Sequence, residues 1–166
     1  MSPEHARAID EVHRCVGRNV LLYQTIEQVL KMLLPLMRHD DALHCLDGFE
    51  DRHSKYSPKT LGPLFQAFHD RNQSDQAQYL NAYVTDLLAQ RNRLVHHAGF
   101  DLSTVDSCRA VASRLNEEHA KAIPIRDLIR DILLEVLRAL CDFTFRGTPE
   151  EAQFRKLLSQ AEVAIT

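Results

Sequence analysis

The sequence predicts an all-α protein, an up-and-down bundle of about four main helices with extra short helices. Three observations support this fold class. Apolar residues recur at helical spacing through most of the chain, β-branched residues form no alternating run, and helix-start signals precede the apolar stretches. The 166 residues fit a single domain, 1–166, because a chain of this length buries a core without disulfides or metals.

The first predicted helix begins at Ser2-Pro3-Glu4, where a capping residue precedes a proline and an acid. Pro35 ends or kinks it near Leu34. A seam of apolar residues follows a heptad pattern along this helix and as far as Met37, interrupted at Asn19: Ile9, Val12, Val16, Tyr23, Ile26, Leu30, Leu33 and Met37. Such a seam packs inside a bundle, forms a dimer contact, or does both on different edges.

Residues 38–60 are predicted to form a polar loop with at most one short helical turn. His39, Asp40 and His44 are metal-ligand residue types, but no further ligand follows at a known spacing, which favours a solvated loop. The next segment is a short helix with its apolar side chains turned inward: Leu61, Leu64, Phe65 and Phe68.

Four further helices are expected. One covers 76–97, before Gly99, with an apolar stripe at Leu80, Val84, Leu87, Leu94 and Val95. Ser103 and Asp106 resemble a capping box that opens the next one. Pro124 is expected to start a separate, strongly apolar helix that runs to about 145, and the C-terminal helix is expected over 148–164.

Composition narrows the function classes. A formal net charge of −3 excludes a strongly basic nucleic-acid-binding domain but allows a local basic site. The four cysteines are scattered without a CxxC pair, which predicts neither a zinc site nor a disulfide framework. No signal peptide and no membrane-length apolar stretch are apparent, so we expect a cytoplasmic protein without a membrane partner. Since no ligand residues stand at a known metal-site spacing, we expect neither a metal nor a cofactor.

The strongest candidate motif is Arg91-Asn92-Arg93-Leu94-Val95-His96. Helical spacing places Arg91 at the centre of the apolar stripe, where an unpaired guanidinium is costly. Asn92 and His96 are four residues apart and share one face, and His97 adds a second imidazole. Two interpretations remain open. Arg91 lines a phosphate site, or it forms a buried ion pair, with Glu27 as the candidate partner, while Asn92 and His96 cap the helix.

An Arg-Asn followed by three residues and a His, near the end of a helix in a small bundle, is similar to the motif of the HEPN superfamily. The resemblance implies a homodimer with a composite cleft and metal-independent endoribonuclease activity, often in toxin–antitoxin or phage-defence systems. It assigns catalysis to Arg91, Asn92 and His96, with His97 and Glu27 as possible support. The implied partners are RNA, such as tRNA or mRNA, and an antitoxin or regulatory protein.

One residue departs from a HEPN subgroup. Toxins paired with minimal nucleotidyltransferase antitoxins carry Tyr two residues after the His, and Ala98 stands there in this chain. Neutralisation by modification of that Tyr is therefore not expected. Some HEPN domains have lost activity, so the alternative function is an inactive HEPN-like interaction module that dimerises and recruits or regulates a partner.

Overall fold

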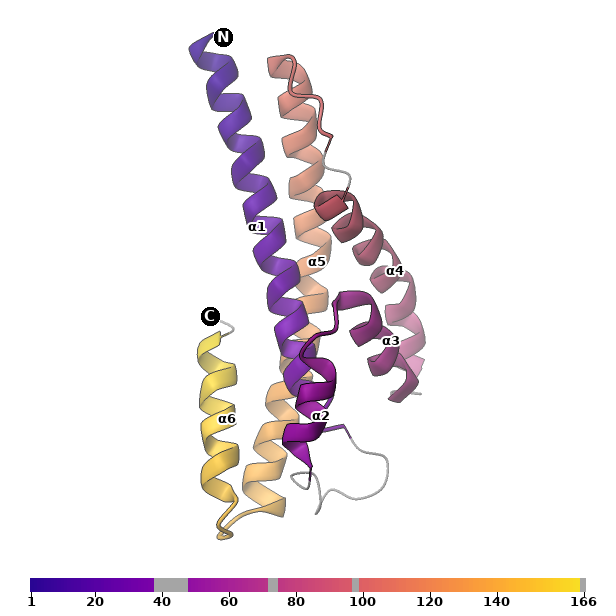
Figure 1. The fold of residues 1–166 in the computed structure, drawn as a ribbon, viewed down its shortest axis with the longest axis vertical. Coiled ribbons are helices and arrows are strands. Elements are labelled where there is room, and N and C mark those ends of the chain that lie inside the picture. Colours follow the sequence, from indigo (N-terminus) through magenta and orange to yellow (C-terminus); the bar gives the residue numbers. More distant parts are fainter. Residues whose placement is uncertain (38–47, 72–74, 97–98, 165–166) are drawn as a thin grey trace.

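The computed structural model describes residues 1–37, 48–71, 75–96 and 99–164 (Figure 1). Within these ranges every regular element is a helix and there is no strand, which confirms the predicted all-α bundle. The elements are α1 (Pro3–Leu33), α2 (Phe49–Tyr56), α3 (Leu61–Arg71), α4 (Asp75–His96), α5 (Val105–Ala139), the π-helix η2 (Leu140–Thr144) and α6 (Glu151–Ala164).

Helix α1 follows its sequence signals closely. Ser2 is the N-cap and its hydroxyl accepts a hydrogen bond from the His5 amide at 3.2 Å, with proline at the first helical position. The predicted seam packs inside the bundle, since Val12, Ile26 and Leu33 are fully buried. Asn19 occupies the gap in the seam and is itself fully buried, and its Nδ2 donates to the Leu115 carbonyl at 2.9 Å.

Helix α5 corrects two predictions. The expected break at Pro124 is absent, and a single 35-residue helix replaces the two predicted helices. Its N-cap is Thr104 rather than Ser103, and a capping box joins Thr104 to Ser107. The prolines of helix interiors lack an N–H and strain the preceding turn. Here burial on both sides of Pro124 outweighs that cost, because Ala122 and Ile125 are both core residues of the same stripe.

The two long helices, α1 and α5, lie side by side and run in the same direction along the molecule (Figure 1). Helices α4 and α6 run opposite to α5 and pack against it from different sides, so the four long helices alternate in direction along the chain, as predicted. Helix α6 begins at Glu151, three residues after the predicted start of the C-terminal helix at 148.

The predicted loop 38–60 is partly wrong. Residues 48–60 contain the two-turn helix α2, which buries Tyr56 beneath the cations of Lys59 and Arg71. A single buried aromatic leaves too little apolar periodicity to be recognised in a segment this short. Residues 38–47, with His39, Asp40 and His44, lie outside the described residues. The inward-facing residues of α3 are confirmed, all buried: Leu61, Leu64, Phe65 and Phe68.

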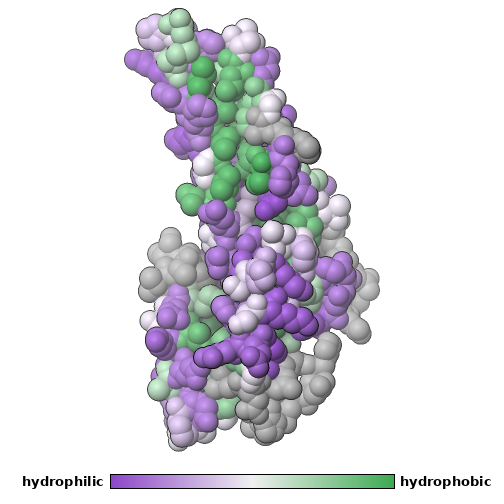
Figure 2. Space-filling view, in the orientation of Figure 1, coloured by the Kyte–Doolittle hydropathy of each residue, from purple (hydrophilic) through white to green (hydrophobic). Residues whose placement is uncertain are grey.

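The N-terminal ends of α1 and α5 extend beyond the shorter helices (Figure 1). They are joined by an ion pair between Arg109 and Glu4 at 2.8 Å, and His5 Nε2 lies 2.8 Å from the Leu102 carbonyl oxygen. Figure 2 shows apolar residues running along this end of the molecule. Two apolar residues in the N-terminal half of α1, Ile9 and Val16, are only partly buried. None of the described helices is long and apolar enough to cross a membrane.

Candidate functional site

The C-terminal part of α4 faces the core through Leu87, Gln90 and Leu94, which are 2%, 8% and 6% exposed. The prediction that Arg91 lies at the centre of the core-facing stripe is therefore wrong. On a helical wheel Gln90 and Arg91 lie on opposite sides of the line through Leu87 and Leu94, and the structure turns the helix so that Gln90 faces inward. Val95, a predicted stripe residue, is 49% exposed for the same reason.

Arg91 is half-buried on the flank of α4, and Asn92 and His96 are exposed. The Arg91 Nη1 atom donates to Asn92 Oδ1 at 3.2 Å and lies 3.5 Å from His96 Nε2. Because a guanidinium only donates, the imidazole nitrogen is the acceptor at the second contact. The last turns of α4 thus gather a guanidinium, an amide and an imidazole at the protein surface.

The other arginine of the motif has a different role. Arg93 lies about 200° around the helix from Arg91, and its Nη2 donates to Glu118 Oε1 on α5 at 3.0 Å. The Glu118 side chain is only 10% exposed, whereas that of Arg93 is 59% exposed. The ion pair that the sequence suggested for Arg91 is therefore made by Arg93, and it joins α4 to α5.

Tyr23 of α1 borders the same pair. Its side chain is buried, and its hydroxyl has no hydrogen-bond partner among the described residues. Burial, together with the negative charge of Glu118 and partly offset by Arg93, raises the pKa of Tyr23 to about 12. Tyr23, Glu118 and Arg93 thus come from α1, α5 and α4 and meet where the three helices contact one another.

Two other predicted site residues do not join the cluster. Glu27 was the candidate partner of Arg91, but its Oε1 accepts from Lys31 Nζ at 2.8 Å on the same helix. This i,i+4 pair forms because Glu27 and Lys31 are adjacent on one face of α1. His97, the second imidazole, lies outside the described residues.

Glu118 and Arg93 were not among the residues singled out from the sequence. A signal for Glu118 exists, because it falls in the buried stripe of α5 between Leu115 and Ala122. An acid in that register, like an arginine in a core stripe, indicates a buried charge that requires a partner. Arg93 carried no such signal, because its position on α4 is a solvent-facing one.

The cluster on α4 suits phosphate chemistry. A guanidinium binds and orients a phosphate but does not act as a base. An imidazole accepts or donates a proton near neutral pH, and the Asn92 amide can hold its neighbour or a phosphate oxygen. Among the described residues, no three His, Cys, Asp or Glu side chains gather in a way that could hold a metal ion.

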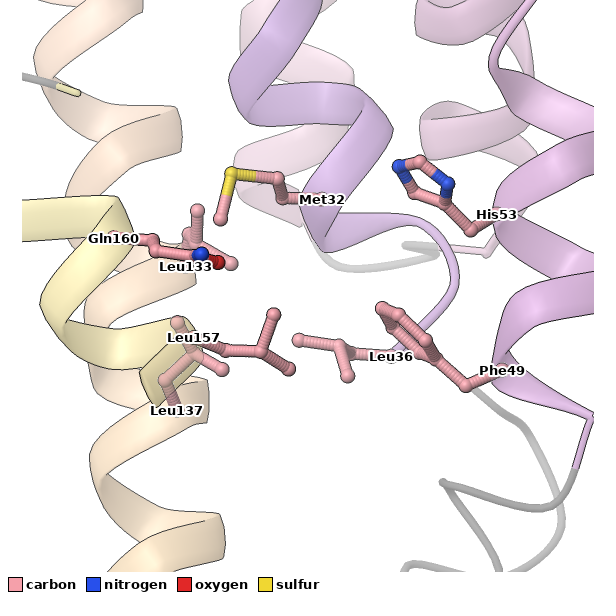
Figure 3. Close-up of a pocket in the computed structure, with 8 residues that line it drawn as sticks. All are labelled: Met32, Leu36, Phe49, His53, Leu133, Leu137, Leu157 and Gln160. Carbon is pink, nitrogen blue, oxygen red and sulfur yellow. The ribbon is translucent and has the colours of Figure 1, made fainter. Parts of the chain in front are cut away.

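A cavity of about 310 Å³ lies at the other end of the bundle, between α1, α2, α5 and α6 (Figure 3). Leucines from α5, from α6 and from the segment just after α1 surround it, with Met32 and the stacked rings of Phe49 and His53, whose centroids are 6.0 Å apart. Among the described residues that line it, the polar side chains are His53 and Gln160, and none is an Asp, Glu, Lys or Arg. The described lining therefore offers no guanidinium or ammonium group to a phosphate, and the α4 cluster is the better candidate site.

Comparison with known proteins does not assign the chain to a family. No family model matches the sequence, and neither the curated proteins nor the solved structures include a match.

Proposed function

We propose that the chain is a metal-independent endoribonuclease of HEPN type that acts at a composite homodimer site. The observation that supports this most strongly is the surface cluster of Arg91, Asn92 and His96, in which Arg91 Nη1 lies 3.5 Å from His96 Nε2. The Arg91 guanidinium is not needed for the interhelical ion pair, because Arg93 forms that pair with Glu118.

The proposed reaction is attack of an RNA 2′-hydroxyl on the neighbouring phosphorus. The bond from phosphorus to the 2′-oxygen forms as the bond to the 5′-oxygen breaks, which leaves a 2′,3′-cyclic phosphate and a 5′-hydroxyl. His96 accepts the proton of the 2′-hydroxyl. Arg91 binds the non-bridging oxygens and stabilises the charge that develops on them, and Asn92 orients one of these two groups.

A second protomer completes this site. The 5′-oxygen must gain a proton as it leaves, and one protomer offers a single described imidazole in the cluster, so the His96 of a two-fold-related copy supplies the acid. The exposed Val95 lies directly beside His96 and provides apolar surface for such a contact. The biological setting that the motif suggests is a toxin–antitoxin or phage-defence system, with tRNA or mRNA as substrate.

The test is incubation of the purified protein with total RNA and with tRNA in EDTA, beside His96→Ala and Arg91→Ala. The matched controls are His13→Ala and Arg7→Ala, which remove an exposed histidine and an exposed arginine from α1. We expect cleavage in the parent and both controls and none in the two α4 variants. Cleavage that survives in His96→Ala, or that disappears from the parent when EDTA is added, contradicts the proposal.

The exposed Val95 also favours a second function, a non-catalytic interaction module that dimerises through this surface. Sedimentation of the parent and of Val95→Asp distinguishes the two. A module that dimerises here loses its dimer in Val95→Asp and cleaves no RNA in any form. A nuclease loses its dimer and its cleavage together.

A further inference from the structure

We propose that Glu118 is a positioning residue for the α4 cluster, which it holds in place through Arg93. This inference rests on the proposed ribonuclease function, and it deepens that function by adding a residue outside the motif. Glu118 itself does not contact the cluster. Its effect passes through α4, whose last turns carry Arg93 on one flank and Arg91 on the other.

The geometry supports this role in two ways. First, Glu118 is a fixed anchor: its side chain is 10% exposed and lies in the core stripe of α5, so it cannot move without disturbing the α1–α5 contact. Second, Arg93 lies three residues before His96 and two after Arg91, within the same turns of α4. A tether at Arg93 therefore limits both the rotation and the fraying of the helix end that carries the cluster.

Rotation of α4 matters because two residues compete for the inward position. Gln90 and Arg91 lie on either side of the line from Leu87 to Leu94, and Gln90 faces inward. The Arg93–Glu118 pair draws the opposite flank of α4 towards α5 and so favours the orientation that leaves Arg91 near the surface. Without the pair, a modest rotation of α4 would turn Arg91 towards the core and away from the surface on which a substrate would bind.

The experiment compares Glu118→Gln and Arg93→Ala with the parent. The matched control is Glu4→Gln, which removes the carboxylate from another interhelical pair with arginine, far from the motif. We expect kcat for RNA cleavage to fall between about tenfold and about a hundredfold in both α4–α5 variants, because a displacement of about 1 Å in an active site has an effect of this size. KM should change little, and the double variant should be no worse than either single one.

A purely structural pair gives another result. Glu118→Gln and Arg93→Ala would then melt at lower temperatures but keep the parent's kcat well below their melting temperatures, which overturns the proposal. Arg93 as a phosphate ligand is also distinguishable. In that case Arg93→Ala raises KM and reduces the salt dependence of binding, Glu118→Gln does neither, and the proposal is again overturned.

Amide hydrogen exchange separates this inference from the nuclease proposal. In both variants we expect faster exchange at Val95 and His96, the last residues of α4, and unchanged exchange in Glu4→Gln. If the parent cleaves no RNA but the exchange increases, the nuclease function fails and the positioning of α4 by Glu118 stands. If exchange at these amides is unchanged, the positioning role is overturned whatever the activity.

Discussion

Replacement of Arg91 by alanine tests whether the guanidinium belongs to a surface site or to the core. The structure gives it two contacts, at 3.2 and 3.5 Å, with neutral groups of its own helix. Each such contact contributes at most about 0.5 kcal/mol, and alanine is as good a helix former as arginine. We therefore expect the free energy of unfolding to change by no more than about 1 kcal/mol, and Tm by no more than about 4 °C.

Urea denaturation followed by circular dichroism measures this change, with Arg7→Ala and Arg93→Ala for comparison. Arg7→Ala should also be nearly neutral, because Arg7 is exposed on α1. Arg93→Ala should cost about 1–2 kcal/mol, because it leaves the buried Glu118 carboxylate unpaired while solvent still reaches the vacated position. A loss of about 3–5 kcal/mol for Arg91→Ala would show that Arg91 is a buried ion-paired residue, and would refute the surface site.

Two further predictions concern α5. Pro124→Ala should stabilise the protein by about 2 kcal/mol. Proline in a helix interior costs about 3 kcal/mol relative to alanine, and its restriction of the unfolded chain offsets up to about 1 kcal/mol of this cost. A lower Tm in this variant would show that the packing of α5 on α1 depends on the proline. His119 has its pKa lowered from 6.5 by burial and by the charges of Arg18 and Arg126. Because its folded-state pKa lies below its unfolded one, the unfolded state binds the proton first as pH falls, so stability should decrease below about pH 6.5 in urea titrations. His119→Gln should show a smaller decrease, and an unchanged pH profile would contradict this assignment.

The sequence predicted those elements whose own residues carry the signal. Helix α1 has its cap at Ser2, its seam and its end before Pro35, and the structure places all three as expected. The inward face of α3 was also correct. In these segments the hydrophobic period, the capping side chain and the proline agree, so little was left for tertiary contacts to decide.

The errors occurred where local signals and packing disagree. Pro124 is a strong local signal for a helix start, but the apolar stripe of α5 continues through it and packs along α1. The capping signal at Ser103 was displaced by one residue, because Thr104 and Ser107 satisfy each other reciprocally. The continuation through Pro124 could not be read from the sequence, since it depends on how the whole of α5 lies against α1. The Thr104 cap is a local contact that a second capping signal one residue later could have indicated.

Of the predicted site residues, Arg91, Asn92 and His96 lie together in the structure, whereas Glu27 pairs with Lys31 instead. The helical spacing correctly brought Asn92 and His96 to one exposed face of α4. It could not decide which of Gln90 and Arg91 would face inward, because the two lie almost symmetrically about the core-facing line. The choice depends on Glu118, which is 25 residues from Arg93 in the chain and on another helix.

The buried polar residues of the described chain are Asn19, Gln90 and Glu118, one each from α1, α4 and α5. Apolar layers between helices tolerate sliding and rotation, whereas a polar residue in a core layer fixes the register, because a wrong register leaves it without a partner. Asn19 fixes α5 against α1 through the Leu115 carbonyl, and Glu118 fixes α4 against α5 through Arg93. A bundle that served only as a spacer would gain nothing from so exact an orientation of the end of α4. Burying the Glu118 carboxylate costs free energy, and this cost has a function if Arg91 and His96 must be held in one orientation. The decisive measurement is therefore the effect of Glu118→Gln on kcat rather than on Tm.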